Sequence, residues 1–375
     1  MSRLHKEDTT KKVVVFHLFN DFSGSPKVLS MALEALIADG YDVTLFTSDG
    51  GVLDGLISHD TVHKHTINYS FSPNPIVTVW RLLRSQTVSF FKALRYCRTH
   101  GSATYINTNL PFGAALGAKL AGSRVIYHYH ENAFAKGLMY RMLACWMKRI
   151  ADDIICVSDY QAEHLSCSKE RVHVIPNALP ASLAVSLKPL PAAAFERKSI
   201  LMISSLKEYK GTLEFISLAS EMPQFRWDIV VNASRTEIDA YIEHHNLNIK
   251  PLKNLRIYPR QSDISHFYNN ASLVISLTNP DMAVETFGLT AAEAMTAGLP
   301  VIVPTVGGIA DLVTDGYNGY KLDVRNLSAI GDKIREILTD KDLYMRLAAG
   351  AMEKSREFNP VIFSSAICSL FNKEP

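Results

Sequence analysis

The sequence predicts an α/β protein of two domains, each built on a mainly parallel sheet with helices on both faces. Short apolar runs typical of buried strands alternate with helical patterns in both halves of the chain. A segment rich in Pro, Ala and Ser, residues 178–199, separates the halves and indicates an interdomain connection. The length of 375 residues also exceeds what one compact core usually supports. We therefore expect domains at residues 1–185 and 186–355, and a closing helix at residues 356–375 that packs back on the first domain.

The apolar runs give the expected strands in order. In the first half they are residues 13–19, 43–48, 103–109, 124–130, 153–158 and 172–177, with helical patterns such as residues 26–39 between them. In the second half they are residues 199–205, 227–233, 254–260, 273–278 and 301–305. The last stretch, residues 358–372, has apolar residues at helical spacing and predicts the closing helix.

Composition excludes several classes of protein. A net charge of +2 gives no reason to expect a nucleic-acid partner. No apolar run is long enough for a membrane-spanning helix, and the polar N-terminus lacks the apolar core of a signal peptide. The five cysteines never form a CxxC pair, so we expect a reduced, cytoplasmic protein without a structural zinc site.

The segment ETFGLTAAEAMTAGLP, residues 285–300, suggests a ligand site. A strand at residues 273–278 leads through a loop containing Glu285 into a helix that begins near Leu289 and ends at Gly298. In open α/β sheets such loops bind ligands, and the free N–H groups of a helix N-terminus suit phosphate. Carboxylates beside a phosphate site suit a ligand that also presents hydroxyls, so phosphate plus sugar is implied. The alternative is that Glu293 only occupies a solvated helix face.

Other strand ends carry further candidates. The loop NDFSGSP, residues 20–26, contains Gly24 but lacks the GxGxxG dinucleotide fingerprint, and an ordinary turn is the alternative. His128 and His130 share one face of a strand, and His130 lies at its carboxyl end, although a purely structural histidine remains an alternative. Lys207 and Lys210 follow the first strand of the second half. Their loop is interpreted as an anion site, and an ordinary solvated loop is the alternative.

A metal site is not expected. His128, His130, Cys145 and Cys156 have no compact ligand spacing. No DxD-like pair of acids occupies a suitable loop either.

In these motifs the chain resembles the retaining glycosyltransferases of the GT-B fold, in glycosyltransferase family 4 (group 1). ETFGLTAAE resembles the E-x7-E element of that family, and GLPVIVPTVGG follows it as it does there. The NDFSGSP loop, the strand end YHYHEN, the VIPN segment and SLKEYKG agree in order and spacing. The resemblance runs from about residue 13 to residue 371. It implies two Rossmann-like domains facing each other across a cleft, with the acceptor bound by the first and the nucleotide sugar by the second.

The resemblance also implies roles for the residues around E-x7-E. Glu285 contacts the donor sugar hydroxyls, and the backbone at Phe287, Gly288 and Leu289 meets sugar and phosphate. Glu293 binds the ribose hydroxyls of the nucleotide.

Three further residues gain roles from the resemblance. Lys210 neutralises the diphosphate, Gly24 lies against the phosphates and acceptor, and His130 stands near the anomeric centre. The expected catalytic residues are therefore Glu285 and His130.

One departure concerns the positive charge at the phosphates. Such enzymes commonly carry Gly-Arg-Leu where this chain has Ser204, Ser205 and Leu206. Ser205 then takes the position of the arginine, and Lys207 is the candidate for the second positive charge. The alternative is a more weakly held diphosphate.

The implied activity is retaining, metal-independent transfer of a hexose-type sugar from a UDP- or GDP-sugar to a glycan acceptor, without a cofactor. The acceptor is expected to be lipid-linked, as in assembly of bacterial surface polysaccharide such as O-antigen, capsule or exopolysaccharide. A nucleotide-sugar 2-epimerase and a non-catalytic nucleotide-sugar-binding subunit are the alternatives.

Two segments concern whether the protein meets its acceptor at a membrane surface. Residues 76–98 and 134–153 predict helices that mix basic with large apolar side chains. Either both are ordinary helices packed on the sheet, or their basic faces meet anionic lipid on the inner face of the cytoplasmic membrane.

Overall fold

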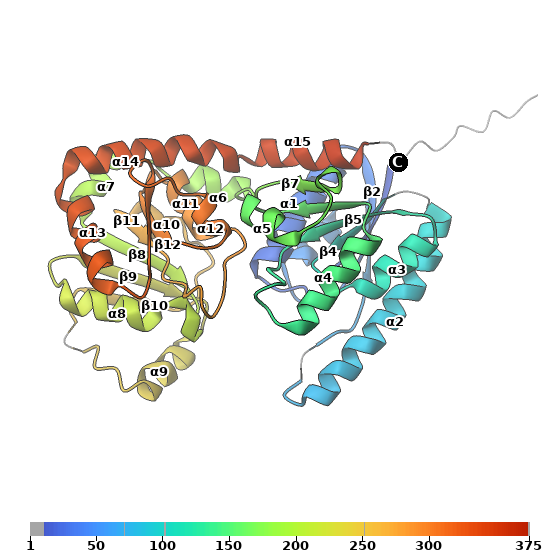
Figure 1. The fold of residues 1–375 in the computed structure, drawn as a ribbon, viewed down its shortest axis with the longest axis horizontal. Helices are drawn as coiled ribbons and strands as arrows, with labels where there is room; N and C mark the ends of the chain where they lie inside the picture. The colour runs from blue at the N-terminus through green and yellow to red at the C-terminus, as the bar shows by residue number, and fades with distance from the viewer. Residues whose placement is uncertain (1–10, 71, 101–102, 251, 374–375) are drawn as a thin grey trace, which may run out of the picture. The chain divides into compact units, whose positions relative to one another are not determined.

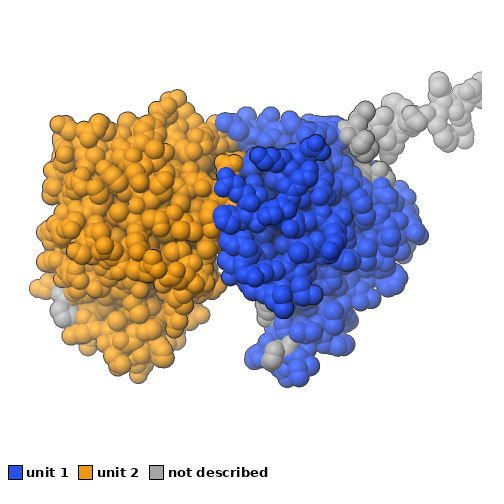
Figure 2. All heavy atoms as spheres, viewed as in Figure 1, with its two compact units in different colours: residues 1–157, 162–175, 361–375 blue, residues 158–161, 176–360 orange. Residues whose placement is uncertain are grey.

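The computed structural model describes residues 11–70, 72–100, 103–250 and 252–373. The chain forms two compact units, shown in different colours in Figure 2. Unit 1 comprises residues 1–157, 162–175 and 361–375, and unit 2 comprises residues 158–161 and 176–360.

Unit 1 is built on a seven-stranded sheet in the order β3-β2-β1-β4-β5-β6-β7, and every neighbouring pair is parallel. The strands are β1 (Lys11–Phe16), β2 (Tyr41–Thr47), β3 (Val62–Thr66), β4 (Ala103–Asn107), β5 (Arg124–Tyr129), β6 (Asp153–Cys156) and β7 (Val172–Val174).

Helices cover both faces of this sheet (Figure 1). The helical elements are α1 (Gly24–Ala38), η1 (Val52–Ser58), α2 (Pro75–His100), α3 (Phe112–Leu120), α4 (Leu138–Ile150), α5 (Asp159–Leu165), η2 (Lys169–Arg171) and α15 (Pro360–Phe371). Buried residues of α2, α3 and α4 share one apolar core with alternate residues of the strands, such as Tyr127 and Tyr129. On the opposite face the Phe371 ring of α15 packs against the rings of Tyr41 and Tyr105, with centroids 6.3 and 5.2 Å away.

Unit 2 repeats the architecture with a six-stranded parallel sheet in the order β10-β9-β8-β11-β12-β13. The strands are β8 (Ser199–Ser204), β9 (Arg226–Val231), β10 (Leu255–Tyr258), β11 (Leu273–Ile275), β12 (Val301–Pro304) and β13 (Gly319–Leu322). The helical elements are α6 (Ala181–Ser186), α7 (Pro191–Arg197), η3 (Glu208–Lys210), α8 (Thr212–Glu221), α9 (Arg235–His244), α10 (Ser265–Asn269), α11 (Leu289–Thr296), α12 (Gly308–Asp311), α13 (Leu327–Thr339), α14 (Lys341–Lys354) and η4 (Ser355–Phe358).

Each sheet has a point where the direction of chain winding reverses. In unit 1 it lies between β1 and β4, and in unit 2 between β8 and β11. Loops that leave the carboxyl ends of strands at such a point diverge and leave room for a ligand. The predicted site residues lie in or beside these loops: Gly24 follows β1, His130 follows β5, Lys210 follows β8 and Glu285 follows β11.

The predicted α/β class is confirmed, and most predicted elements are present with shifted ends. β3 and β13 were not predicted. In β3, VHKHT, only Val62 is buried, so this edge strand lacks the apolar run that marks the others. The predicted helix at residues 134–153 begins only at Leu138. Among the helices of the described ranges, none combines the length and apolar character that a bilayer crossing requires.

Candidate active site

The loop between β11 and α11 in unit 2 carries Glu285, and hydrogen bonds from neighbouring segments hold its backbone in place. The N–H of Gly308 donates to the Glu285 carbonyl at 2.9 Å, and the Ser158 hydroxyl donates to the Thr286 carbonyl at 2.8 Å. A Cβ at Gly308 would lie 1.9 Å from the Thr286 oxygen, so only glycine permits this approach. The GG pair of the sequence therefore fixes the position of the predicted catalytic loop.

The side chain of Glu285 meets Lys210, which comes from the neighbouring strand end after β8. Lys210 Nζ forms an ion pair with Glu285 Oε1, and the Thr278 hydroxyl donates to the same oxygen at 3.0 Å. The two charged side chains remain 25% and 24% exposed. Two residues that the sequence reasoning selected from separate motifs are thus in direct contact, and both reach solvent.

The amino end of α11 follows directly. Gly288 caps the helix in the left-handed region, with φ 96°, and a Cβ there would meet the Ile309 side chain at 2.4 Å. Phe287 is buried, while Leu289 begins the helix and is half-buried. The first N–H groups of a helix have no partners within it, so this end of α11 suits an anion.

Glu293 lies inside α11 and is 9% exposed, which rules out the alternative that it only occupies a solvated face. Its Oε2 accepts a hydrogen bond of 2.5 Å from the hydroxyl of Tyr268, a fully buried residue of α10. No local sequence pattern marks Tyr268, because its contact with Glu293 arises only when α10 and α11 pack together.

Ser205 and Lys207 lie in the loop after β8. The Ser205 carbonyl accepts a hydrogen bond from the Thr212 hydroxyl at 3.4 Å. Lys207 is exposed, and the ammonium groups of Lys207 and Lys210 lie 5.8 and 5.7 Å from the Tyr209 ring centroid. Both lysines therefore lie beside one aromatic ring, but it is Lys210 that meets Glu285.

In unit 1 the half-buried His130 belongs to a hydrogen-bonded chain centred on Asn107, at the end of β4. Asn107 Nδ2 lies 3.3 Å from the Ser25 carbonyl and 3.1 Å from His17 Nδ1, while Asn107 Oδ1 lies 2.9 Å from His130 Nε2. A carbonyl can only accept, so the amide nitrogen must face Ser25 and the amide oxygen must face His130. His130 Nε2 therefore carries the hydrogen, and in the neutral ring Nδ1 is an acceptor.

The three imidazoles of this edge are held neutral. Burial lowers the pKa of His17 to about 4 and that of His128 to about 3. The pKa of His130 is lowered well below its usual range, by burial and then by the neighbouring His128, His17 and Lys136. The His128 and His130 rings lie 4.1 Å apart, as expected for side chains on one face of a strand.

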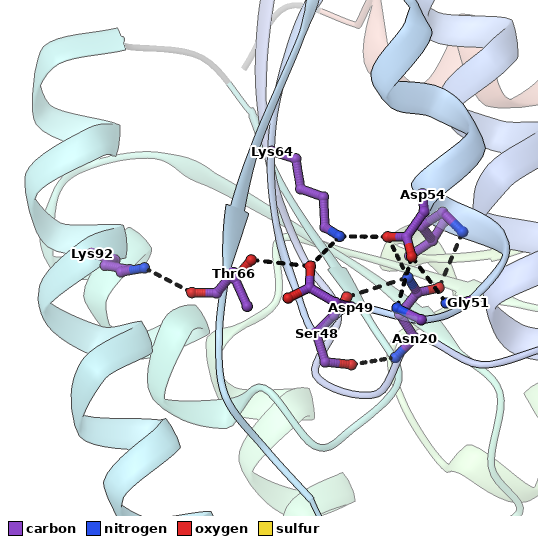
Figure 3. A network of polar contacts seen from close by, with 10 residues as sticks. Asn20, Ser48, Asp49, Gly51, Asp54, Lys64, Thr66 and Lys92 are labelled. Atoms are coloured by element: carbon purple, nitrogen blue, oxygen red, sulfur yellow. Dashed lines mark hydrogen bonds and ion pairs between the residues drawn. The ribbon is translucent and has the colours of Figure 1, made fainter.

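Gly24 is exposed and begins α1, next to Ser25 of the Asn107 chain. Asn20, at the start of this loop, is buried and bonds to the segment after β2, as Figure 3 shows. Its amide donates to the Ser48 carbonyl at 3.2 Å and to Asp54 Oδ1 at 3.1 Å. Lys64 in turn forms ion pairs with Asp54 and Asp49. This network fixes the base of the loop and leaves Gly24 at its surface.

The structure therefore brings Lys210 together with Glu285 of the loop that leads into α11, whereas Ser205 and Glu293 contact Thr212 and Tyr268. It places His130 and the Gly24 loop at one edge of unit 1. Sequence reasoning missed the residues that hold them: Asn107, Ser158, Tyr268 and Thr278. Ser158 and Thr278 ended predicted strands, and that position was an available signal, whereas Asn107 lay inside the strand predicted at residues 103–109. Within the described residues, no three His, Cys, Asp or Glu side chains come together as a possible metal site.

Comparison with known families gives two matches that together span most of the chain. Residues 22–183 match the model described as glycosyltransferase family 4, and residues 191–354 match the model described as glycosyl transferases group 1.

Individual relatives match over shorter stretches. A D-inositol 3-phosphate glycosyltransferase of Xylanimonas cellulosilytica is 26% identical over 231 residues, which are 56% of this chain and 54% of the relative. A poly(glycerol-phosphate) alpha-glucosyltransferase of Bacillus subtilis is 24% identical over 238 residues, 62% of this chain and 34% of the relative. The chain thus spans about half, or less, of the length of these curated relatives.

Among solved structures, HepE of Anabaena in complex with UDP and glucose is similar in fold. The TM-score is 0.77 at 18% sequence identity, and the match covers 97% of this chain and 100% of that one. At this identity the likeness concerns the fold alone.

Proposed function

Because the chain belongs to the group 1, family 4 glycosyltransferases of the GT-B fold, we propose that it transfers a hexose-type sugar from a nucleoside diphosphate sugar to a glycan acceptor. The observation that carries the proposal is the contact between Lys210 and Glu285 beside the amino end of α11. A cation and helix N–H groups suit a diphosphate, while a carboxylate suits sugar hydroxyls. One ligand that needs both is a nucleotide sugar.

The chemistry follows from charge placement. As the bond between the sugar and the diphosphate breaks, negative charge develops on the leaving phosphate oxygen. Lys210 and the N–H groups at Gly288 and Leu289 are preorganised to meet that charge, and such preorganised donors stabilise a transition state strongly. We propose that these groups suffice without a metal or other cofactor, with UDP or GDP as the leaving group. Lys207 is the candidate for a second positive charge.

Retention at the anomeric carbon is also part of the proposal. The acceptor hydroxyl would attack the face from which the diphosphate leaves, and the leaving phosphate would take its proton. His130, neutral and with Nδ1 as an acceptor, is proposed to bind a sugar hydroxyl near the anomeric centre.

A direct assay tests this function. The full-length protein is incubated with UDP- and GDP-hexoses and candidate glycan acceptors, and the products are identified by mass spectrometry and NMR. We expect an α-linked product from an α-linked donor. An epimeric sugar formed without acceptor would instead indicate a nucleotide-sugar 2-epimerase, and no turnover of any donor would favour a binding subunit.

The outer face of α2 supports an acceptor carried on a membrane lipid. Four large apolar side chains recur there at helical spacing and are 56 to 77% exposed: Ile76, Trp80, Leu83 and Phe91. The same face carries the exposed Arg84, Arg95 and Arg98, and α2 contains no acidic residue. The opposite face packs closely on α3, where a Cβ at Gly113 or Gly117 would meet α2 backbone oxygens at 2.4 and 2.3 Å.

Exposed apolar side chains among basic ones favour an anionic membrane surface. We therefore propose peripheral attachment of unit 1 to such a surface, in the assembly of a bacterial surface polysaccharide. Leu138, Met139 and Met142 of α4 are 75, 51 and 65% exposed and could extend the contact.

Liposome flotation tests the attachment. Binding to vesicles that contain phosphatidylglycerol should weaken as salt rises, because charge attraction is screened within about 8 Å at physiological ionic strength. The Arg84→Gln/Arg95→Gln variant should bind less. Lys92→Gln is the matched control, because the Lys92 ammonium lies beside Thr66 O and the Phe46 ring instead. A protein that ignores these vesicles at low salt would leave a soluble acceptor as the better proposal.

A further inference from the structure

A buried tyrosine hydroxyl holds the carboxylate of Glu293. Tyr268, the fourth residue of the short helix α10, has no exposed surface, and its hydroxyl lies 2.5 Å from Glu293 Oε2 and 3.4 Å from the Thr290 carbonyl. An ionised carboxylate and a carbonyl can only accept. The tyrosine hydroxyl is therefore the donor, and its stronger hydrogen bond goes to the carboxylate.

This hydrogen bond compensates for the burial of the Glu293 carboxylate. Its neighbours in α11 are small or apolar, and it is itself 9% exposed. A carboxylate in such a place is costly unless hydrogen bonds compensate for the lost water. Burial and the adjacent Glu293 raise the pKa of Tyr268 well above its usual range, so the hydroxyl keeps its proton.

We propose that Tyr268 is a positioning residue for Glu293, and that the pair makes the site select ribonucleotide over 2′-deoxyribonucleotide donors. The inference rests on the proposed function and extends it with the role that the family resemblance implies for Glu293, which is to accept hydrogen bonds from the ribose of the nucleotide. With one oxygen engaged by a rigid, buried phenol, the carboxylate has a fixed rotamer and plane. A carboxylate held in this way can accept from both hydroxyls of a ribose at once, whereas a 2′-deoxyribose offers one of them.

The experiment compares UDP with 2′-deoxy-UDP, and GDP with 2′-deoxy-GDP, by isothermal titration calorimetry on the full chain. The proteins are the wild type, Tyr268→Phe, Glu293→Gln, the double variant and Tyr344→Phe. Tyr344 is the matched control, because it is also fully buried in unit 2 but donates to the Ser272 carbonyl at 2.8 Å. Binding of the 2′-deoxy nucleotide reports whether each variant keeps a folded site.

We expect the wild type to prefer the ribonucleotide by about tenfold or more, since a hydrogen bond to a charged group is strong and tenfold corresponds to about 1.4 kcal/mol. Tyr268→Phe should lower this preference by about 3- to 10-fold, and Glu293→Gln should nearly abolish it. In the double variant, loss of the tyrosine hydroxyl should add nothing to the effect of Glu293→Gln. Tyr344→Phe should keep the wild-type preference.

Two results would overturn the inference in different ways. If Glu293→Gln abolishes the preference but Tyr268→Phe leaves it intact, Tyr268 does not position the carboxylate, although the proposed role of Glu293 stands. If Glu293→Gln itself leaves the preference intact, Glu293 does not bind the ribose and the inference fails, although the proposed function stands. If the wild type binds neither UDP nor GDP, the proposed function itself fails. Should Tyr268→Phe not fold, Tyr268→Met, which also lacks a donor, allows the same comparison.

Discussion

Replacing Glu285 by Gln is expected to tighten the binding of UDP while it lowers sugar transfer. Lys210 is paired with Glu285, and the Thr278 hydroxyl donates to the same carboxylate oxygen. A diphosphate must compete with Glu285 for the lysine and must also approach a negative charge. Glutamine keeps the shape of the side chain, removes the charge and so releases Lys210 for the phosphates.

The expected gain in UDP binding free energy follows from the exposure of the two side chains and from the distance between the carboxylate and the phosphate charge. Because both side chains are about a quarter exposed, we assign the ion pair the energy of a solvent-screened pair, about 0.2–1 kcal/mol. Repulsion between the carboxylate and a phosphate charge on the order of 6 Å away adds about 0.7–3 kcal/mol over effective dielectric constants of roughly 80 to 20. After screening we expect a gain of about 1–2 kcal/mol, which corresponds to about 5- to 30-fold tighter UDP binding.

Transfer should change in the opposite direction. In this variant the protein lacks the charged acceptor for the hydroxyls of the donor sugar, and each hydrogen bond to such a charged group is worth about 1.5–3 kcal/mol. We therefore expect kcat/KM to fall by about 100-fold or more.

Calorimetry with UDP, at low and at physiological salt, together with steady-state transfer measures both effects. Glu336→Gln is the matched control, because Glu336 also pairs with a lysine of unit 2, Lys333 at 2.7 Å. Unchanged or weaker UDP binding in Glu285→Gln, or the same gain in Glu336→Gln, would refute the reasoning. Near-normal transfer by Glu285→Gln would remove it from the catalytic residues.

Four further predictions concern the other charged and polar groups. Lys210→Ala should weaken binding of UDP far more than that of uridine, and calorimetry showing equal losses would contradict a phosphate contact. Asn107→Ala should release His130 from its Nε2–H tautomer, which nitrogen-15 NMR of the imidazole would detect; an unchanged spectrum would show that Asn107 does not set the tautomer. Because burial lowers the pKa values of His17 and His128 to about 4 and about 3, the unfolded chain binds more protons than the native one below pH 6.5. The free energy of unfolding should then fall as pH drops from 6.5, by about 2 kcal/mol per histidine at pH 5, and urea titrations of His128→Gln should show a smaller fall. Transfer should persist in EDTA, and a loss that added Mg²⁺ restores would refute metal independence.

The sequence predicted the strands that are buried on both faces, because such strands require continuous apolar runs. It failed at β3, where Lys64 points to Asp49 and Asp54 and only Val62 is buried. An edge strand whose side chains form ion pairs carries no periodic apolar signal.

The candidate site divides in the same way. Glu285, Lys210 and Glu293 were predictable because residue type, strand ends and helix ends mark them locally. Their partners were not, since the contacts of Tyr268 with Glu293 and of Asn107 with Ser25 join elements 25 and 82 residues apart. Such contacts depend on the packing of whole helices and strands, which a local pattern does not contain.

The route of α15 has a consequence for how the protein is made. Its aromatic and polar contacts with Tyr41, Tyr105 and Ala35 belong to unit 1, yet the ribosome translates it only after all of unit 2. Domains usually fold as units during synthesis, N-terminal first. Here the strands of the unit 1 sheet are synthesised first, and α15, the last helix to cover that sheet, follows only after nearly two hundred further residues. A nascent chain paused within unit 2 would therefore lack the packing of Phe371 on the rings of Tyr41 and Tyr105.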